Sequence, residues 1–360
     1  MIVGIYILGF LYCSYMAFQI FRFRSFSKKT SFHETYELPF SIILPFRNEA
    51  TNLPQLLASL EQVEYSNYEF IFVNDYSTDE SEEIVERANT KFKLIQNEKE
   101  PGKKAALEIG IEAAQYNHII TWDTDITIHP QILKEFNHAF QLKNDMVLGP
   151  VSFSAKNNFA ANYGMLENTS LVAFGLMDAR AGQPSMSNGA NLGFRKDLFL
   201  KSGGYAANKT QAGGDDEFLM HSFAKSKAKI GALCSSQAMV YTQAMSHWKG
   251  FIHQRIRWGK KIKKYPLRIK AAYILSQGLY IAFLGLSILA LVQKQYLSLA
   301  VVFGSKLLFD FLWFTTIQPF FQIRIDYAFA IASSIFQVLI TPLVFVQVLM
   351  GKAEWKGRKI

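Results

Sequence analysis

The sequence predicts an α/β domain with a mostly parallel sheet, flanked by transmembrane helices, one before the domain and about three after it. Three observations lead to this prediction. Apolar residues are concentrated at the two ends of the 360-residue chain. The central part alternates short β-rich runs with helical patterns, which is typical of a parallel sheet with crossover helices. The apolar stretches near the ends are about long enough to span a bilayer.

The first predicted element is a membrane anchor at residues 1–22. Residues 1–21 carry no charge, and the basic residues that follow are Arg22, Arg24, Lys28 and Lys29. A cleavable signal peptide would place positive charge before the apolar run and small residues at a cleavage site, and the sequence has neither. Because Lys and Arg favour the cytoplasmic side, the N-terminus is expected outside and the next domain in the cytoplasm, on a cell or inner membrane.

The central domain is expected between residues 38 and 246. Four apolar runs that end in polar residues predict its first strands, at residues 39–45, 68–75, 92–97 and 118–123. Helical patterns lie between the first three runs and around residues 104–115. In parallel sheets, ligands bind beyond the carboxyl ends of the strands. The polar residues expected to converge there are Arg47, Asn48, Glu49, Asp75, Asp123 and Asp125.

Two carboxylates, Asp123 and Asp125, follow the fourth predicted strand in the segment TWDTD. No GxGxxG follows the first strand and no GxxxxGK[ST] occurs, so a dinucleotide site or a P-loop has little support. A phosphate-bearing ligand would then be held through Mg²⁺ or Mn²⁺, which binds one or two carboxylates together with phosphate oxygens. The alternative is a turn, in which Asp side chains bond to nearby backbone groups.

A basic segment at residues 247–270 and three apolar stretches follow the domain. Lys249 to Lys270 holds nine Lys or Arg and no Asp or Glu, in a chain with a formal net charge of +9. Because this segment directly precedes a membrane span, it fits the headgroup layer better than nucleic acid. Residues 271–350 are expected to form transmembrane helices at about 271–292, 296–317 and 327–350. Three full crossings would leave the basic tail outside, and a re-entrant or interfacial stretch would remove this conflict.

Seven segments appear in order: PFRNEA, VNDYSTDES, PGKKAAL, TWDTD, SNGANLGFRKDLFLKSGGY, GGDDEFL and QRIRW. Together they resemble the membrane-bound family 2 glycosyltransferases with a GT-A (Rossmann-like) fold, a group that includes cellulose, chitin and hyaluronan synthases and ceramide glucosyltransferases. The resemblance covers about residues 38–260. It implies an inverting hexosyltransferase that uses a nucleotide-sugar donor, with a UDP-sugar favoured, and Mg²⁺ or Mn²⁺ as cofactor.

The resemblance places the donor site in the first four segments. The residues that would shape or contact the nucleotide pocket are Pro45, Arg47, Glu49 and Asp75. Lys103 matches the family's lysine near the diphosphate, which suits a compact point charge. Asp125 would be the main metal ligand, and Asp123 would contact the sugar or ribose and share the metal.

The later segments carry the implied base and the acceptor side. Asp216, beside Asp215 in GGDDEFL, would take the proton from the attacking hydroxyl. The alternative is a helix start capped by Asp215 or Gly214, and both readings can hold. The residues expected at the acceptor or the diphosphate are Asn188, Gly189, Asn191, Arg195, Gln254, Arg257 and Trp258. The last three form the Q-x-x-R-W motif, whose Arg can pair with phosphate oxygens.

The sequence leaves the acceptor open between a lipid or lipid-linked molecule and a growing polysaccharide. A synthase that exports its polymer needs enough helices for a channel, so about four spans favour the lipid unless an oligomer or partner subunit adds more. A non-catalytic membrane scaffold that binds sugar nucleotides is the rival from another class. A transporter has less support, because the main charges in the apolar stretches, Lys306 and Asp310, are one helical turn apart and can pair.

Overall fold

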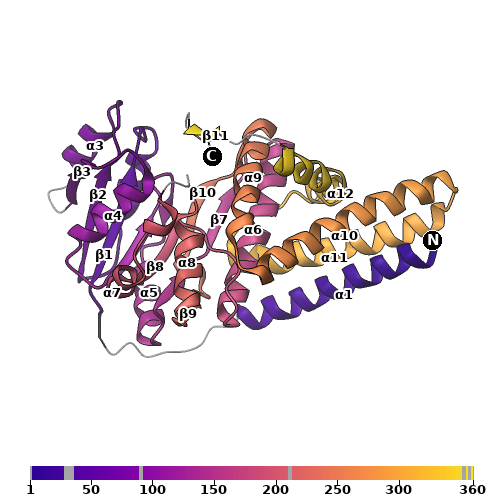
Figure 1. Cartoon of the computed structure of the whole chain (residues 1–360), viewed down its shortest axis with the longest axis horizontal. Coiled ribbons are helices and arrows are strands. Elements are labelled where there is room, and N and C mark those ends of the chain that lie inside the picture. Colours follow the sequence, from indigo (N-terminus) through magenta and orange to yellow (C-terminus); the bar gives the residue numbers. More distant parts are fainter. Residues whose placement is uncertain are drawn as a thin grey trace. The chain divides into compact units, whose positions relative to one another are not determined.

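The computed structural model describes residues 2–27, 36–88, 92–209, 213–350, 354–355 and 358–359 (Figure 1). The chain divides into two compact units. The sheet unit comprises residues 27–153 and 171–243, and the membrane unit comprises residues 1–26, 154–170 and 244–360. Residues 154–170 therefore group with the apolar helices, although they lie inside the range expected for the central domain.

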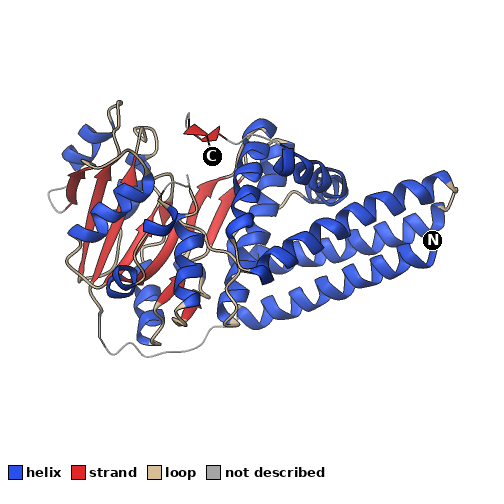
Figure 2. Cartoon of the chain, in the orientation of Figure 1, coloured by secondary structure: helices blue, strands red, loops and turns tan. Residues whose placement is uncertain are grey.

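The sheet unit is built on a mostly parallel sheet (Figure 2). Within the described residues its strand order is β3-β2-β1-β4-β8-β6-β9. The bounds are β1 (Phe40–Phe46), β2 (Tyr68–Asn74), β3 (Phe92–Gln96), β4 (His118–Trp122), β6 (Met146–Leu148), β8 (Asn191–Arg195) and β9 (Ile230–Ala232). The four strands predicted from apolar runs are confirmed, and they lie parallel to one another. The β8 strand, which was not predicted, runs antiparallel to both β4 and β6.

Helices and a smaller sheet complete this unit. The helices are α2 (Leu53–Leu60), α3 (Ser81–Ala88), α4 (Lys103–Ala113), α5 (Ile132–Gln141), α7 (Lys196–Lys201), α8 (Asp215–Lys225) and the short 3-10 turns η1 (Ala206–Asn208) and η2 (Ser236–Ala238). The smaller sheet has the order β5-β10-β7, with β5 (Thr127–Ile128), β10 (Val240–Gln243) and β7 (Val151–Ser154). The α6 helix (Phe159–Arg180) begins in the membrane unit and ends in the sheet unit.

The packing of α4 against β1 in the core determines where Lys103, at the start of α4, lies. Every residue of β1 is buried, as expected for a central strand covered on both faces. At Gly110 of α4, an added Cβ would lie only 2.4 Å from Cγ2 of Ile43, so this glycine permits a close approach of the helix to β1. Because α4 follows β3, its N-terminus with Lys103 reaches the carboxyl edge of the parallel strands.

The membrane unit contains, among the described residues, four helices long and apolar enough to cross a bilayer. They are α1 (Ile2–Phe26), α10 (Leu267–Val292), α11 (Tyr296–Phe321) and α12 (Tyr327–Met350). The prediction of one helix before the domain and three after it is confirmed. Each C-terminal helix has 24 to 26 residues, enough for a full crossing. Lys28 and Lys29, part of the charge order used to orient the anchor, lie outside the described residues.

The remaining elements of the membrane unit are shorter. The basic segment forms α9 (Trp248–Lys261) and the 3-10 turn η3 (Ile262–Lys264), and the tail contains β11 (Glu354–Trp355) and β12 (Arg358–Lys359). The α1, α10 and α11 helices run side by side in Figure 1 and contact one another.

The two charged residues of α11, Lys306 and Asp310, form an ion pair. Nζ of Lys306 lies 2.5 Å from Oδ2 of Asp310, and the Tyr12 hydroxyl donates a hydrogen bond to the same carboxylate. Lys306 and Asp310 are 2 % and 4 % exposed. The pairing expected from their spacing is confirmed. A buried, paired lysine and aspartate are compatible with an apolar bundle, so they give no added support to a transport pathway.

Candidate active site

Lys103 joins two of the predicted carboxylates in the sheet unit. Its Nζ lies 2.6 Å from Oδ1 of Asp123, beyond the end of β4, and 3.2 Å from Oδ2 of Asp215, at the start of α8. Burial opposes the positive charge, but the two carboxylates raise the pKa of Lys103 well above its ordinary value. The structure therefore brings a permanently charged lysine and residues from two distant segments of the sequence together.

Gly189 and Asp216 extend this cluster. The backbone N–H of Gly189 donates to Oδ2 of Asp216 at 2.8 Å, and the N–H of Glu217 donates to Oδ1 at 2.8 Å. A Cβ at Gly189 would lie 3.3 Å from Oδ2 of Asp215, which would have to move by a few tenths of an ångström, and 3.4 Å from Nζ of Lys103. An ionised carboxylate only accepts hydrogen bonds and protons, which is what a general base requires.

The N-cap of α8 is Gly214, with φ of 73°. Its left-handed backbone suits glycine, and one of the two capping residues expected from the sequence is thus confirmed. Asp215 and Asp216 occupy the first helical turn, where the helix dipole favours negative charge. No side chain caps the helix. The carboxylate of Asp215 therefore contacts Lys103, and that of Asp216 accepts from the N–H of Gly189.

Asp125 lies in a group of carboxylates. Although the residue as a whole is exposed, desolvation of its carboxyl together with the charges of Asp123 and Glu49 raises the pKa of Asp125 to about 6. Among the residues that the structure describes, no three His, Cys, Asp or Glu side chains are grouped to hold a metal by themselves. Such an arrangement is compatible with a cation that takes its remaining ligands from phosphate oxygens and water. A divalent cation would relieve the repulsion between Asp125 and the neighbouring Asp123 and Glu49, so the charge of these residues fits such an ion.

Hydrogen bonds connect the residues of the predicted nucleotide site that follow β1, β2 and β3. Asp75 is 6 % exposed, and its Oδ1 accepts hydrogen bonds from Nδ2 of Asn97 at 2.7 Å and from the N–H of Gly102 at 2.8 Å. The N–H of Glu49 donates to Oγ of Ser81 at 2.7 Å. These bonds fix Asp75 and Glu49 beside the loops that follow the strands. Pro45 lies in β1 opposite Val73 of β2, and Arg47 follows β1.

Two residues of the VNDYSTDES segment, Asn74 and Tyr76, have local explanations. Tyr76 has a φ of +60°, a left-handed conformation that glycine adopts most easily. Its hydroxyl donates to the backbone oxygen of Lys99, which anchors the ring. Nδ2 of Asn74 donates to Oε2 of Glu82 at 2.8 Å. An aspartate could not donate this bond, so Asn74 suits the acidic neighbour in this chain.

Asn191 has a structural role rather than the predicted acceptor role. It is fully buried, and its Nδ2 donates to the backbone oxygens of Pro150 at 3.0 Å and Ala238 at 2.9 Å. Its Oδ1 accepts a hydrogen bond from Nε1 of Trp122 at 3.2 Å. With its polar atoms engaged inside the protein, this side chain is not available to a substrate. Neighbouring Asn188 uses its Oδ1 to accept the N–H of Ala190 at 3.0 Å.

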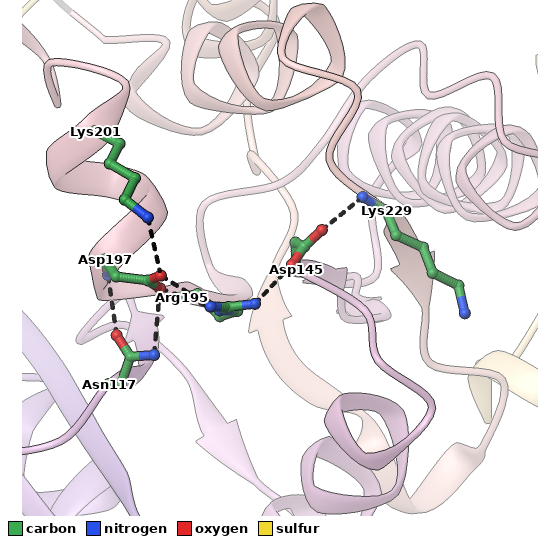
Figure 3. Close-up of polar contacts among 6 residues, drawn as sticks. All are labelled: Asn117, Asp145, Arg195, Asp197, Lys201 and Lys229. Atoms are coloured by element: carbon green, nitrogen blue, oxygen red, sulfur yellow. Dashed lines mark hydrogen bonds and ion pairs between the residues drawn. The ribbon is translucent and has the colours of Figure 1, made fainter.

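Arg195 lies at the wrong end of the sheet for the predicted acceptor site. It pairs with His118, the first residue of β4, whereas Asp123 follows the last residue of that strand. Its guanidinium contacts Asp145 at 3.1 Å and Asp197 at 2.8 Å (Figure 3). Asn117 and Lys229 also bind these two carboxylates. The network ties the antiparallel β8 to the segments before β4, β6 and β9, so Arg195 belongs to the fold and not to the site.

Arg195→Lys is therefore expected to lower stability without a direct effect on catalysis. A lysine cannot replace the fork of donors that reaches Asp145 and Asp197. We expect a loss of about 1–2 kcal/mol, equivalent to a melting temperature lower by a few degrees, with turnover at low temperature within about twofold of the native value. Thermal unfolding and an activity assay on the same sample check this, and a loss of turnover without a loss of stability would contradict it.

The Q-x-x-R-W residues Gln254, Arg257 and Trp258 lie on α9, in the membrane unit. The sequence prediction missed their neighbour Arg255, which is 7 % exposed. Its Nη2 lies 2.7 Å from Oε2 of Glu167 in α6. The sequence contains a signal for this pair, because Glu167 is the only charged residue between Lys156 and Asp178. A lone carboxylate in an apolar helix indicates a cationic partner.

A comparison with known families decides the identity of the fold. The profile described as glycosyl transferase family 21 matches residues 4–360. The chain belongs to this family. Family 21 is a GT2-type family, so the predicted resemblance and the GT-A fold are both confirmed. A mannosyltransferase of Pyrobaculum calidifontis, solved with GDP-Man and Mn²⁺, has the same fold, with a TM-score of 0.61, 16 % identity, and coverage of 94 % of this chain and 98 % of that one.

Curated relatives of this family 21 chain match over shorter segments. An uncharacterised glycosyltransferase of Synechocystis is 33 % identical over 113 residues, which is 30 % of this chain and 36 % of the relative. Dolichol-phosphate mannosyltransferase of Pyrococcus furiosus is 28 % identical over 112 residues, covering 30 % and 32 %. Poly-beta-1,6-N-acetyl-D-glucosamine synthase of Staphylococcus epidermidis is 34 % identical over 90 residues, covering 24 % and 22 %. The matched segments thus span well under half of each relative.

Proposed function

We propose that this protein is an inverting membrane glycosyltransferase that moves a sugar from a nucleotide-sugar donor, with a UDP-sugar favoured, to a hydroxyl of a lipid or lipid-linked acceptor. The observation that carries the proposal is the meeting of Lys103, Asp123 and Asp215 beside Asp216 at one edge of the sheet. Membership of family 21 supports glycosyl transfer as the reaction class. The catalytic domain is proposed to face the cytoplasm.

Asp216 is the proposed general base. Its two oxygens are held by the N–H groups of Gly189 and Glu217, which fix the direction of the carboxylate. It takes the proton of the acceptor hydroxyl as the oxygen attacks the anomeric carbon, and the bond from that carbon to the diphosphate breaks on the opposite side. A single displacement of this kind inverts the anomeric configuration. A positioned base contributes about 10²–10⁴-fold to such a reaction.

Lys103 and the carboxylates at the strand ends are proposed to hold the donor. The Lys103 ammonium is a point charge for the diphosphate, and Asp75, fixed by Asn97 and Gly102, contacts the nucleoside. Asp125, with a share from Asp123, would hold Mg²⁺ or Mn²⁺. When bound, the cation would act as a Lewis acid that offsets the charge developing on the departing diphosphate.

The relatives support a nucleotide-sugar donor and a membrane acceptor. The neighbour from Pyrobaculum calidifontis was solved with GDP-Man and Mn²⁺, and the name of the Pyrococcus relative specifies a lipid phosphate acceptor. Four helices long and apolar enough to cross a bilayer, found among the described residues, support a membrane location close to such acceptors. The Staphylococcus synthase is named for a polysaccharide product. Synthesis of a polysaccharide is therefore included as an outcome of the test.

The test is nucleoside diphosphate release by the purified, detergent-solubilised protein. A panel of UDP-sugars and GDP-mannose would be supplied with Mg²⁺ or Mn²⁺, with and without a membrane lipid extract. We expect metal-dependent UDP release that requires the extract. Release from GDP-mannose alone would overturn the favoured donor, release that requires an oligosaccharide primer would favour a polysaccharide synthase, and binding of UDP with no release from any donor would favour the scaffold.

The affinity for Mn²⁺ is expected to depend on pH through Asp125. Its pKa of about 6 means that the carboxyl is protonated below that pH, and a proton then competes with the cation. Affinity should fall by about tenfold per pH unit below pH 6 and level off above about pH 7. Titration of Mn²⁺ against the protein at several pH values measures this, with Asp125→Asn as the control that should flatten the profile. An equally steep profile in that variant would assign the pH dependence to another group.

A further inference from the structure

A second charged cluster, in the membrane unit, surrounds Arg255. Its Nε and Nη2 donate to Oε2 of Glu167 at 2.9 and 2.7 Å, and Nη2 also donates to Oδ1 of Asn168 at 2.6 Å. Glu167 and Asn168 lie in the part of α6 that belongs to the same unit. The guanidinium is therefore fixed by another helix, with both its position and its plane determined.

The same guanidinium contacts two of the three residues expected from the Q-x-x-R-W motif. Its Nη1 donates to Oε1 of Gln254 at 2.9 Å. Its central carbon lies 4.4 Å from the ring centroid of Trp258, on the next turn of α9, and equally close to the ring of Phe251. Four of the five N–H donors that an arginine carries are engaged by these partners. One buried side chain thus connects α6 to Gln254 and Trp258.

Packing alone does not explain this arrangement. A buried ion pair is often no more stabilising than apolar residues of the same size, and Glu167 is the only charged residue between Lys156 and Asp178. What the pair provides is a fixed direction for the groups that the arginine touches. A lysine would neutralise Glu167, but it has neither the planar fork that reaches Gln254 nor the flat face that stacks on Trp258.

We propose that Arg255, held by Glu167 and Asn168, is a positioning residue that orients Gln254 and Trp258 toward the acceptor. This inference rests on the proposed function, because it gives the two motif residues a role on the acceptor side of the transfer. It also gives a role to Arg255, a position that the motif Q-x-x-R-W leaves unspecified. Arg255 acts through its neighbours and does not itself touch the reacting atoms.

The kinetic test compares Arg255→Lys with Arg195→Lys. Arg195 is an equally networked arginine that the fold uses far from the carboxylate cluster. In Arg255→Lys, kcat/KM for the acceptor is expected to fall by about 10- to 100-fold, as for a misplaced positioning group, while KM for the nucleotide sugar stays within about threefold. A merely structural role would lower stability without a selective loss for the acceptor, and the matched Arg195→Lys control is expected to behave in this way, with both substrates within about twofold of native. An acceptor kcat/KM within twofold of native would overturn the inference.

Glu167→Gln is a milder variant in case Arg255→Lys does not fold. It keeps one oxygen that can accept from the guanidinium but removes the charge that anchors it. We expect a loss in acceptor kcat/KM that is smaller than in Arg255→Lys, by about three- to tenfold, again with KM for the donor unchanged. Native values for both substrates in a folded Glu167→Gln protein would contradict the role assigned to α6.

A spectroscopic measurement separates this inference from the proposed function. The chain has five tryptophans, and replacing them with 5-fluorotryptophan gives fluorine resonances, of which Trp258→Phe identifies one. Arg255→Lys should move the Trp258 resonance, and Arg195→Lys should not. If native protein transfers no sugar but the resonance moves, the proposed function fails and the orienting contact stands. If the resonance stays in place, the positioning inference fails whatever the activity.

Discussion

Asp216→Asn is expected to reduce the rate of sugar transfer by about 10³-fold, because the amide cannot take the proton of the acceptor hydroxyl. The substitution keeps the size of the side chain and one oxygen that can accept from Gly189 or Glu217. Nucleotide affinity should therefore stay within about threefold of native. Single-turnover transfer and protection of the protein by UDP against thermal unfolding give the two quantities separately.

The matched control for this prediction is Glu217→Gln, the next acidic residue of the same helical turn. It removes a negative charge from the first turn of α8, next to Asp216. Turnover should stay within about twofold of native. Equal losses in Asp216→Asn and Glu217→Gln would show a general electrostatic effect of the helix start. Native turnover in Asp216→Asn would contradict the assignment of Asp216 as the general base.

Asp125→Asn is expected to lower turnover by about 10²-fold or more and to weaken the response to Mn²⁺. The substitution removes the negative charge of the main proposed ligand, whose pKa is raised to about 6 by desolvation and by the carboxylates of Asp123 and Glu49. A hard divalent cation prefers charged oxygen ligands, so an amide is a poor replacement. The measurement is the rate of transfer as a function of Mn²⁺ concentration in both proteins.

Glu64→Gln serves as the control for the metal prediction. Glu64 is an exposed carboxylate of the sheet unit that pairs with Lys134 at 3.1 Å. Its loss should leave both the rate and the Mn²⁺ response within about twofold of native. An Asp125→Asn protein that keeps the native response to Mn²⁺ would contradict the assignment of Asp125 as the main ligand.

The parallel half of the fold was predictable because its signal is local. Buried parallel strands have continuous apolar runs, and the polar residues at their ends mark the edge at which ligands bind. The antiparallel β8 carries no such signal. Its five residues, Asn191 to Arg195, pair with β4 in the reverse direction, and this pairing depends on distant partners such as Asp145. Neither the hydrophobic period nor the composition of residues 191–195 can show that this strand runs antiparallel to its neighbours.

The same reversal explains which site residues were misplaced. Because β8 is antiparallel, Gly189 before it lies at the carboxylate edge, whereas Arg195 at its end reaches the opposite edge. A motif read along the sequence treats the two as neighbours. The salt bridge from Lys103 to Asp215 joins residues more than a hundred positions apart, and only their motif resemblance suggested that they meet.

The most direct test of the central claim is the fate of a labelled sugar. The purified protein would be given the labelled UDP-sugar that supports UDP release, together with a membrane lipid extract and Mn²⁺, and the products would be partitioned between water and an organic solvent. Our account predicts a product in the organic phase whose anomeric configuration is opposite to that of the donor, and no such product from Asp216→Asn. Label found only in a long water-soluble or insoluble polymer, or a product that retains the donor's configuration, would contradict it.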